Sequence, residues 1–403
     1  MNRTKTISHF PRYFFILIYL VLCAPAEAQF VFHEHASLPE PGRDDAVCFI
    51  LNNQVYVTGG GGDGFLIQPD LWRYDPISDS WLALEDFPGL PRQYAYANTL
   101  GGKAYLIGGL TTSGEPLNEL WEYDPAIDHW TEKSSLPGPA RFKAVGFVIG
   151  NSLYYGTGTN GSLVFKDFWR YDVASDQWTF LPDIPGQGRH ECIAFAHESQ
   201  AYIGGGIDFS GNHSSDLFHW NREQHTWNQL TDMPFSIAYA EAACARGFCA
   251  IWDGLVNEEF SGEIQQPVFE AYVLDPVSDF RSFSIPGVPL RNTSVCSTGN
   301  IIYRFGGKDS TQQKYSTLIS MTWEQEVELI VYPNPSRGEI HISTSIPWTR
   351  LRILDATGTL VYALESDELL VSRDLRIDLF LQGPGLYFLL VDNITPKRFI
   401  FSP

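Results

Sequence analysis

Short apolar runs that end in glycine recur along most of the chain. They are VYVTGG from Val55, AYLIGG from Ala104, LYYGTG from Leu153, AYIGGG from Ala201, CAIWDG from Cys249 and IYRFGG from Ile302. Runs this short, rich in β-branched and aromatic residues and bounded by glycine, are typical of buried strands that lead into a turn. No long amphipathic helical pattern interrupts them, so the pattern predicts an all-β protein.

Two further markers recur in register with these runs. The Asp or Asn of a Tyr-Asp-like pair stands at positions 75, 124, 172, 221 and 275, at spacings of 49, 48, 49 and 54 residues, and a tryptophan follows it in the first four units. An acidic residue opens this pattern at Asp70, Glu119, Asp167, Asp216 and Glu270. An arginine begins all units except the fifth, at Arg43, Arg92, Arg141, Arg189 and Arg291.

A period of about 50 residues with these markers resembles the Kelch repeat. The resemblance covers roughly residues 30–323 and implies a β-propeller. Six units can be counted, and the sixth ends without an outer strand of its own. We expect residues 30–38 to complete the sixth blade, because closure of this kind hides the edges of the end blades. The expected fold is all-β, a six-bladed Kelch-type propeller closed by an N-terminal strand.

The period stops after Trp323, and strands separated by Gly and Pro turns follow, which predicts a small β-sandwich over 331–403 after a linker at 324–330. This stretch resembles the type A sorting domain of the type IX secretion system of Bacteroidetes. The matching residues are Tyr332-Pro333-Asn334-Pro335, Gly338, the turn from Asp355 to Gly358, Gly385 with Leu386-Tyr387-Phe388, and Lys397-Arg398. The resemblance implies passage through the periplasm, translocation by the type IX machinery and removal of this domain.

The N-terminal 28 residues have the three parts of a secretory signal peptide. Basic residues precede an apolar run from Tyr13 to Leu22, and Ala26-Glu27-Ala28 forms a cleavage site before Gln29. Such a run is too short to span a bilayer as a helix. We therefore expect a mature propeller from residue 29 to 323, either secreted or held at the outer-membrane surface, with no transmembrane segment.

The net charge of −20 excludes some classes of partner. A surface this negative repels phosphate backbones, so nucleic acids and anionic membranes are unfavourable ligands. No cofactor motif is present, and the absence of C-x-x-C gives no indication of zinc. His33 and His35 share a strand face, but no third ligand lies nearby, so no metal site is predicted.

Charged residues that recur in nearly every unit are interpreted as structural. We expect the repeat arginines and the opening acids to pair with the backbone or with each other at strand starts. Function in a propeller lies instead in residues that vary between blades around the channel. The positions that follow the repeat arginine vary in this way and predict one funnel formed by Asp45, Tyr94, Lys143, His190, Glu191 and Glu241. A solvated polar rim without a ligand is the alternative.

Five cysteines remain after the leader is removed. Cys244 and Cys249 flank a four-residue loop between two strands, so they are candidates for a hairpin disulfide. Cys48 and Cys296 each lie five residues after a repeat arginine, in blades that adjoin in a closed ring, and form a second candidate pair.

The sequence favours a binding protein that presents its propeller to an extracellular carbohydrate or protein. A sugar-modifying enzyme that resembles sialic acid (N-acetylneuraminate) epimerase is the alternative, through Lys143, His190 and Glu191. A purely structural or adhesive surface protein is the third possibility. Kelch-type propellers also include copper-dependent galactose oxidases, but their set of two Tyr and two His cannot be assembled at matching positions here.

Overall fold

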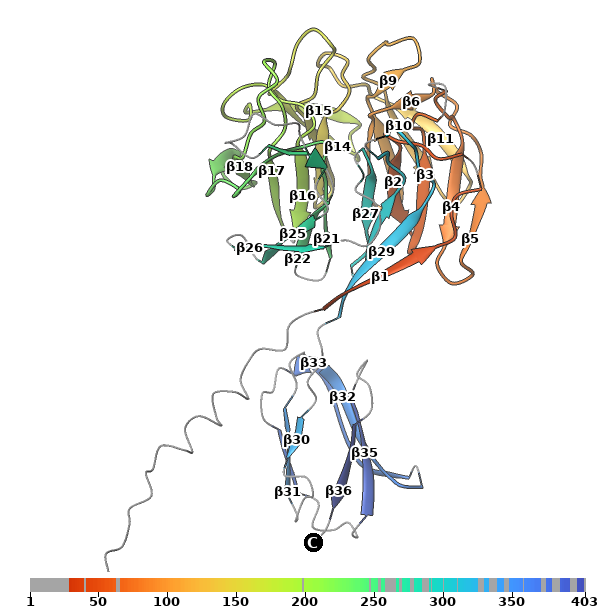
Figure 1. Ribbon diagram of the computed structural model, residues 1–403, viewed down its shortest axis with the longest axis vertical. Coiled ribbons are helices and arrows are strands. Elements are labelled where there is room, and N and C mark those ends of the chain that lie inside the picture. The colour runs from red at the N-terminus through yellow and green to blue at the C-terminus, as the bar shows by residue number, and fades with distance from the viewer. Residues whose placement is uncertain are drawn as a thin grey trace, which may run out of the picture. The chain divides into compact units, whose positions relative to one another are not determined.

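A computed structural model describes residues 29–401, with gaps at 40, 63–65, 198, 246–247, 253–254, 258–265, 268–269, 276–278, 285–289, 291, 300, 310, 325–329, 333–338, 344–347, 358, 371–374, 379–384 and 392–396. The predicted leader, residues 1–28, lies outside the described residues. All regular elements within the described part are strands. The chain divides into a large unit, Val31–Thr322, and a second unit that holds the C-terminal strands (Figure 1).

Each repeat unit contributes to a four-stranded antiparallel sheet whose strands pair in chain order, except that the outer strand of the last sheet comes from the N-terminal end. The first two sheets are formed by β2 (Val47–Leu51), β3 (Gln54–Thr58), β4 (Leu71–Asp75) and β5 (Ser80–Ala83), and by β7 (Tyr96–Leu100), β8 (Lys103–Ile107), β10 (Leu120–Asp124) and β11 (His129–Lys133). The next two are formed by β12 (Val145–Ile149), β13 (Ser152–Gly156), β14 (Phe168–Asp172) and β15 (Gln177–Leu181), and by β16 (Ile193–His197), β17 (Gln200–Gly204), β18 (Leu217–Asn221) and β19 (Thr226–Gln229).

The later units follow the same plan. One sheet is formed by β21 (Glu241–Ala245), β22 (Phe248–Trp252), β25 (Glu270–Asp275) and β26 (Asp279–Ser284), and another by β27 (Ser294–Ser297), β28 (Ile301–Phe305), β29 (Leu318–Glu324) and β1 (Gln29–His35). Short connecting strands form the pair β6 (Arg92–Gln93) and β9 (Leu110–Thr111) and the small sheet of β20 (Ser236–Ala238), β23 (Leu255–Asn257) and β24 (Gln266–Pro267). The first strand of each large sheet contacts the first strand of the next, along β2, β7, β12, β16, β21 and β27, and β27 contacts β2.

The paired glycines of the repeat are required by close backbone approach. Gly59 and Gly60 have φ of 69° and 84°. A Cβ on Gly59 would lie 2.6 Å from the carbonyl oxygen of Arg92, and one on Gly60 would lie 2.8 Å from the Cβ of Ala46. Only glycine fits this turn without strain, because it has no Cβ and tolerates positive φ.

The repeat arginines pair with the opening acids. Arg43 is fully buried and donates to both carboxylate oxygens of Asp70, at 2.6 and 2.9 Å, and to the carbonyl oxygen of Gly59 at 3.3 Å. The same pairing joins Arg92 to Glu119, Arg141 to Asp167 and Arg189 to Asp216. The side chain of Glu270 and the whole of Arg291 lie outside the described residues. The arginine thus ties the start of one sheet to the turn after its second strand, and the acid compensates its buried charge.

Aromatic side chains and turn aspartates join neighbouring sheets. The Tyr171 hydroxyl donates to Asp176 at 2.7 Å, and Asp176 accepts the backbone N–H of Ser134 from the preceding sheet at 3.0 Å. Trp178 Nε1 donates to the carbonyl oxygen of the same Ser134 at 2.7 Å. This junction therefore satisfies backbone groups of one repeat with side chains from the next, while the rings fill the space between sheets.

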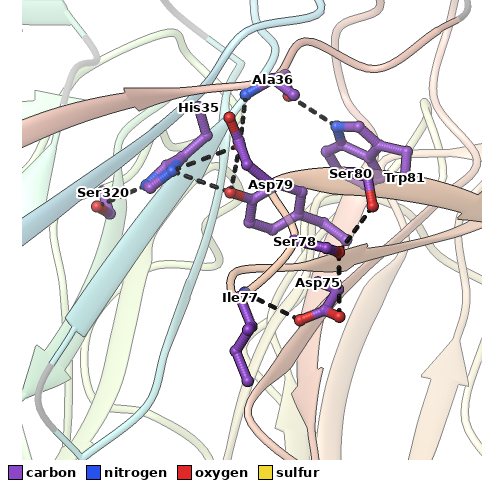
Figure 2. A network of polar contacts seen from close by, with 10 residues as sticks. His35, Ala36, Asp75, Ile77, Ser78, Asp79, Ser80, Trp81 and Ser320 are labelled. Carbon is purple, nitrogen blue, oxygen red and sulfur yellow. Dashed lines mark hydrogen bonds and ion pairs between the residues drawn. The ribbon is translucent and has the colours of Figure 1, made fainter.

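The same junction connects β1 to the first sheet (Figure 2). Ala36 N donates to Asp79 at 2.9 Å, and Trp81 Nε1 donates to the Ala36 carbonyl at 2.7 Å. His35 contacts the Ser320 hydroxyl of β29 at 2.8 Å and the Tyr74 hydroxyl at 3.0 Å. One short segment thus joins the sheet of the last repeat to the sheet of the first. His35 has these structural partners and is not part of a metal cluster among the described residues.

The C-terminal unit contains two antiparallel sheets. One holds β30 (Ile330–Tyr332), β31 (Glu339–Ser343) and β34 (Leu375–Asp378), and the other holds β33 (Leu360–Leu370), β32 (Trp348–Asp355), β35 (Gly385–Val391) and β36 (Lys397–Phe401). Leu351, Ile353 and Leu389 are fully buried. Asp355 stabilises the following turn by accepting the N–H groups of Thr357 and Thr359, each at 2.9 Å.

Candidate functional site

The first strands of the six large sheets, β2, β7, β12, β16, β21 and β27, are called the inner strands below. Residues with positive φ precede each of them and form a ring at one end of these strands. It consists of Asp45, Tyr94, Lys143, Glu191, Tyr239 and Asn292, with φ between 55° and 58°, and is called the polar ring below. The N–H of Asp45 donates to the Asn292 carbonyl at 3.0 Å, and Tyr94, Lys143 and Glu191 each donate to the preceding ring member at 3.1 to 3.2 Å. Non-glycine residues rarely adopt this conformation, so its repetition fixes the direction of several side chains.

The polar ring differs in two places from the expected funnel. In the fifth unit Tyr239 takes the ring position, and Glu241 lies two residues further on, at the start of β21. In the sixth unit the ring residue is Asn292, which puts Leu290 rather than Arg291 in register with the repeat arginines. Ile237 takes that place in the fifth unit, and both aliphatic side chains are buried. Neither unit has the repeat arginine at this place, so the residue that marks the ring position in the first four units is missing from the last two.

Lys143 is the central cation of the polar ring. Its Nζ lies 2.5 Å from Glu191 Oε1, 4.7 Å from the centre of the Tyr94 ring and 5.2 Å from the centre of the Tyr239 ring. Burial opposes the charge of Lys143, but the Glu191 carboxylate outweighs it and raises the pKa of the amine. Two aromatic faces and one carboxylate from different repeats therefore surround one ammonium group.

Asp45 lies in the same cluster. Its Oδ1 accepts a hydrogen bond from Asn292 Nδ2. Burial, followed by the charges of Asp44 and Glu191, raises the pKa of Asp45 well above its ordinary value. Burial and the nearby Asp45 also raise the pKa of Tyr94. Asp44 points to a different cluster, because it forms ion pairs with Lys308 and with Lys314 at 2.8 Å, and these lysines hold its pKa low against the effect of burial.

His190 precedes the ring residue Glu191 and feels the same charges. Burial lowers the pKa of His190, with Glu191 and Lys143 acting in opposite directions, so the imidazole is neutral at pH 7. Its Nδ1 is buried without a hydrogen-bond partner among the described residues. A neutral imidazole with a free nitrogen can accept or donate one proton.

Glu241 lines a cavity of about 280 Å³ bounded by β2, β7, β12, β16, β21 and β27. It is the only residue with a formal charge among the described lining residues. Glu241 is an exposed residue, and part of its surface faces this cavity, called the channel below. Burial, followed by repulsion from Glu191 and Asp45, raises the pKa of Glu241 to about 8. The polar ring and Glu241 together hold three carboxyl groups and one ammonium, so the cluster retains protons at neutral pH.

Comparisons with known proteins agree with the repeat pattern. The family model for the KLHDC2/KLHL20/DRC7 Kelch-repeats domain matches residues 27–206, and that for the secretion system C-terminal sorting domain matches residues 330–400. The chain therefore carries Kelch repeats in its N-terminal half and a type IX sorting domain at its C-terminal end. No curated protein matches it. The solved structure named "Structure of YjhT" covers 72% of this chain and 99% of its own, with 17% identity and a TM-score of 0.61, a likeness that shows the fold alone.

The sorting domain indicates export to the surface or the medium. No helix among the described residues is long and apolar enough to span a membrane.

The loops beside the polar ring carry exposed apolar side chains. Asp44, Phe142 and His190 each bridge to a loop that contains, respectively, Leu66, Leu163 and Phe209, and these three side chains are exposed. The end of the Kelch domain that bears the polar ring therefore has a charged centre and an apolar rim.

The cysteines of the Kelch domain behave in two ways. Cys244 and Cys249 are opposite residues of β21 and β22 and form a disulfide with a Cα–Cα distance of 3.9 Å. Cys48 and Cys296 are buried free thiols, although each is close enough to influence the other. Both line the channel, but no bond joins them.

Proposed function

We propose that this chain is an exported, six-bladed, closed Kelch propeller that binds an extracellular carbohydrate at the polar-ring end of its channel. The asymmetry of the polar ring carries this proposal. A ring with one cation, acids on some repeats and tyrosines on others can orient an asymmetric polar ligand, which a uniform ring cannot.

The contacts between inner strands support six blades and their closure. The first strands of consecutive sheets contact one another from β2 to β27, and β27 contacts β2. β1 pairs with β29, while the Ala36 backbone binds Asp79 and Trp81 of the first sheet. The first and last strands of the Kelch region thus share one sheet, and β1 covers the edge that β29 would otherwise leave open.

The chemistry of the polar ring supports a carbohydrate as the ligand. Lys143 and Glu191 offer a donor and an acceptor 2.5 Å apart, beside the faces of Tyr94 and Tyr239. A sugar presents hydroxyl groups to such polar pairs and C–H faces to aromatic rings. The exposed Leu66, Leu163 and Phe209 extend the contact surface outward from the centre.

A glycan array tests this proposal with the purified mature chain. We expect a defined group of sugars to bind, and K143M and E191Q to lose at least about tenfold in affinity, because each leaves a charged partner uncompensated. K103M is the matched control, since Lys103 forms a comparable ion pair with Glu122 at 2.7 Å away from the polar ring. The absence of any sugar ligand would refute carbohydrate binding and favour a protein partner or an adhesive role.

Glu241 favours a second candidate function, a sugar-modifying enzyme. A carboxyl group with a pKa of about 8 is poised for proton transfer near neutral pH, and the neutral His190 lies near the same charged cluster. Incubation of a bound sugar with the protein in D₂O should then place deuterium on carbon next to a carbonyl or anomeric centre. E241Q should abolish this exchange while binding persists. Binding without exchange in the wild type would identify a non-catalytic receptor.

A further inference from the structure

The opposite end of the inner strands brings together three groups that can ligate a metal ion. These are the imidazole of His197 and the sulfurs of Cys244 and Cys249, whose ligand atoms all lie within 4.8 Å of one another. His197 ends β16, and Cys244 lies near the end of β21, which contacts β16. Glu191 precedes β16 and Glu241 is the first residue of β21, so this cluster is separated from the polar ring by the length of the strands.

We propose that the reduced form of Cys244 and Cys249, together with His197, binds one zinc-type divalent ion, and that the disulfide excludes it. Two thiolates and one imidazole match the preference of zinc, which takes sulfur at about 2.3 Å and nitrogen at about 2.0–2.1 Å. Around a tetrahedral ion of this size, two sulfurs lie about 3.8 Å apart. The fold holds all three donor atoms within 4.8 Å of one another, and breaking the S–S bond frees the two sulfurs to move apart to this separation.

The channel gives an ion access to this cluster. Cys244 is half-buried and lines the cavity of about 280 Å³, whereas Cys249 is buried behind it. Three protein ligands leave the fourth position of a tetrahedral ion free for water from the channel. A search by sequence spacing misses the site, because its ligands come from two different repeats.

The switch has a balanced chemistry. A dithiol reductant gives two electrons and two protons to the Cys244–Cys249 disulfide: the S–S bond breaks, two S–H bonds form on the protein, and the reductant becomes a disulfide. Binding of the divalent ion then releases both thiol protons to solvent, since thiolates are the ligands. Reoxidation expels the ion.

Cobalt(II) tests the proposal with the full chain under anaerobic conditions. After phosphine reduction we expect one equivalent of Co²⁺ to bind, with the sulfur-to-cobalt charge-transfer absorption and intense visible bands of a tetrahedral site. The same bands should disappear on addition of Zn²⁺. The oxidised chain should show no such bands. Equal Co²⁺ binding by the oxidised and reduced chains would overturn the redox switch.

Matched variants identify the ligands. C244S/C249S should lose the charge-transfer bands, and H197A should keep thiolate ligation but bind at least about tenfold more weakly, the minimum seen even for loss of a supporting group. C48S/C296S is the control, because those thiols line the same channel away from His197. Bands that survive in C244S/C249S, or that vanish only in C48S/C296S, would refute the site. If C244S/C249S fails to fold, H197A decides, and an unchanged affinity there refutes the proposal.

Discussion

Lys143 Nζ lies 2.5 Å from Glu191 Oε1, and these two side chains come from adjacent repeats. The pair is largely buried, at 16% and 13% side-chain exposure. Asp45 and Glu241 lie near enough for Glu191 to raise the pKa of both. A single cation therefore holds an otherwise repulsive group of acids together at the channel end.

Breaking this pair should destabilise the propeller. K143M and E191Q should each lower the free energy of unfolding by about 3 kcal/mol, because each leaves one buried partner. The double variant should lose less than the sum, with a coupling of about 1–3 kcal/mol. Urea unfolding of the four proteins measures the cycle. A coupling near zero would mean that the two side chains do not interact.

The sixth unit lacks the buried arginine and its acidic partner, and this predicts how stability responds when the same pair is replaced in the third unit. Leu290 and Thr317 stand there in the places that Arg141 and Asp167 hold in the third unit. R141L should cost about 3–5 kcal/mol, because Asp167 remains partly buried without its partner. Adding D167T should recover most of this loss, since the leucine of R141L then fills the space and no unpaired carboxylate remains. Thermal and urea unfolding of the single and double variants tests this, and a double variant less stable than R141L would contradict it.

Glu241 predicts a loss of stability as pH rises. Its folded pKa of about 8 lies above the ordinary value of 4.5, so the folded state binds the proton more tightly than the unfolded state. The contribution of Glu241 to the free energy of unfolding is fully present below pH 4.5, falls until about pH 8 and then levels off. E241Q lacks this titration and should exceed the wild type in melting temperature at pH 9 but not at pH 4.5. Parallel curves for both proteins across this range would show that Glu241 does not titrate as described.

His35 predicts the opposite dependence. Tyr74 has one hydroxyl proton and donates it to Asp79 at 2.7 Å, so His35 Nδ1 must donate to Tyr74 and Nε2 accept from Ser320. Burial lowers the pKa of His35 from 6.5 despite the nearby Asp79, so the unfolded state binds more protons. Stability at this junction should therefore fall as pH drops below about 6.5. The melting temperature should decrease more between pH 7 and pH 5 for the wild type than for H35Q.

Removal of residues 327–403 should stop export without unfolding the propeller. The match to a sorting domain at residues 330–400 and the separate C-terminal unit support this expectation. In a host with type IX secretion, the shortened chain should accumulate in the periplasm and resist proteases. Fractionation with antibody detection measures this, and the full chain is the control. Delivery of the shortened chain to the surface would show that other residues direct export.

The repeat in the sequence was sufficient for the strands of the sheets and for the pairing of the arginine with the acid in the first four units. This follows because each repeat forms its own sheet from local pairings: Gly59 and Gly60 allow the turn, and Arg43 reaches Asp70 within one unit. Variation after the arginine also pointed to Asp45, Tyr94, Lys143 and Glu191, because these four units keep their marker.

Only the tertiary structure decided what depends on contacts between distant repeats. Tyr239 and Asn292 became visible as ring members through their backbone conformation, since Ile237 and Leu290 have replaced the arginine that would have marked them. The raised pKa of Glu241 and the approach of His197 to Cys244 likewise come from side chains of different sheets. The sequence period specifies each blade, but the distances across the channel are set when the inner strands pack around it.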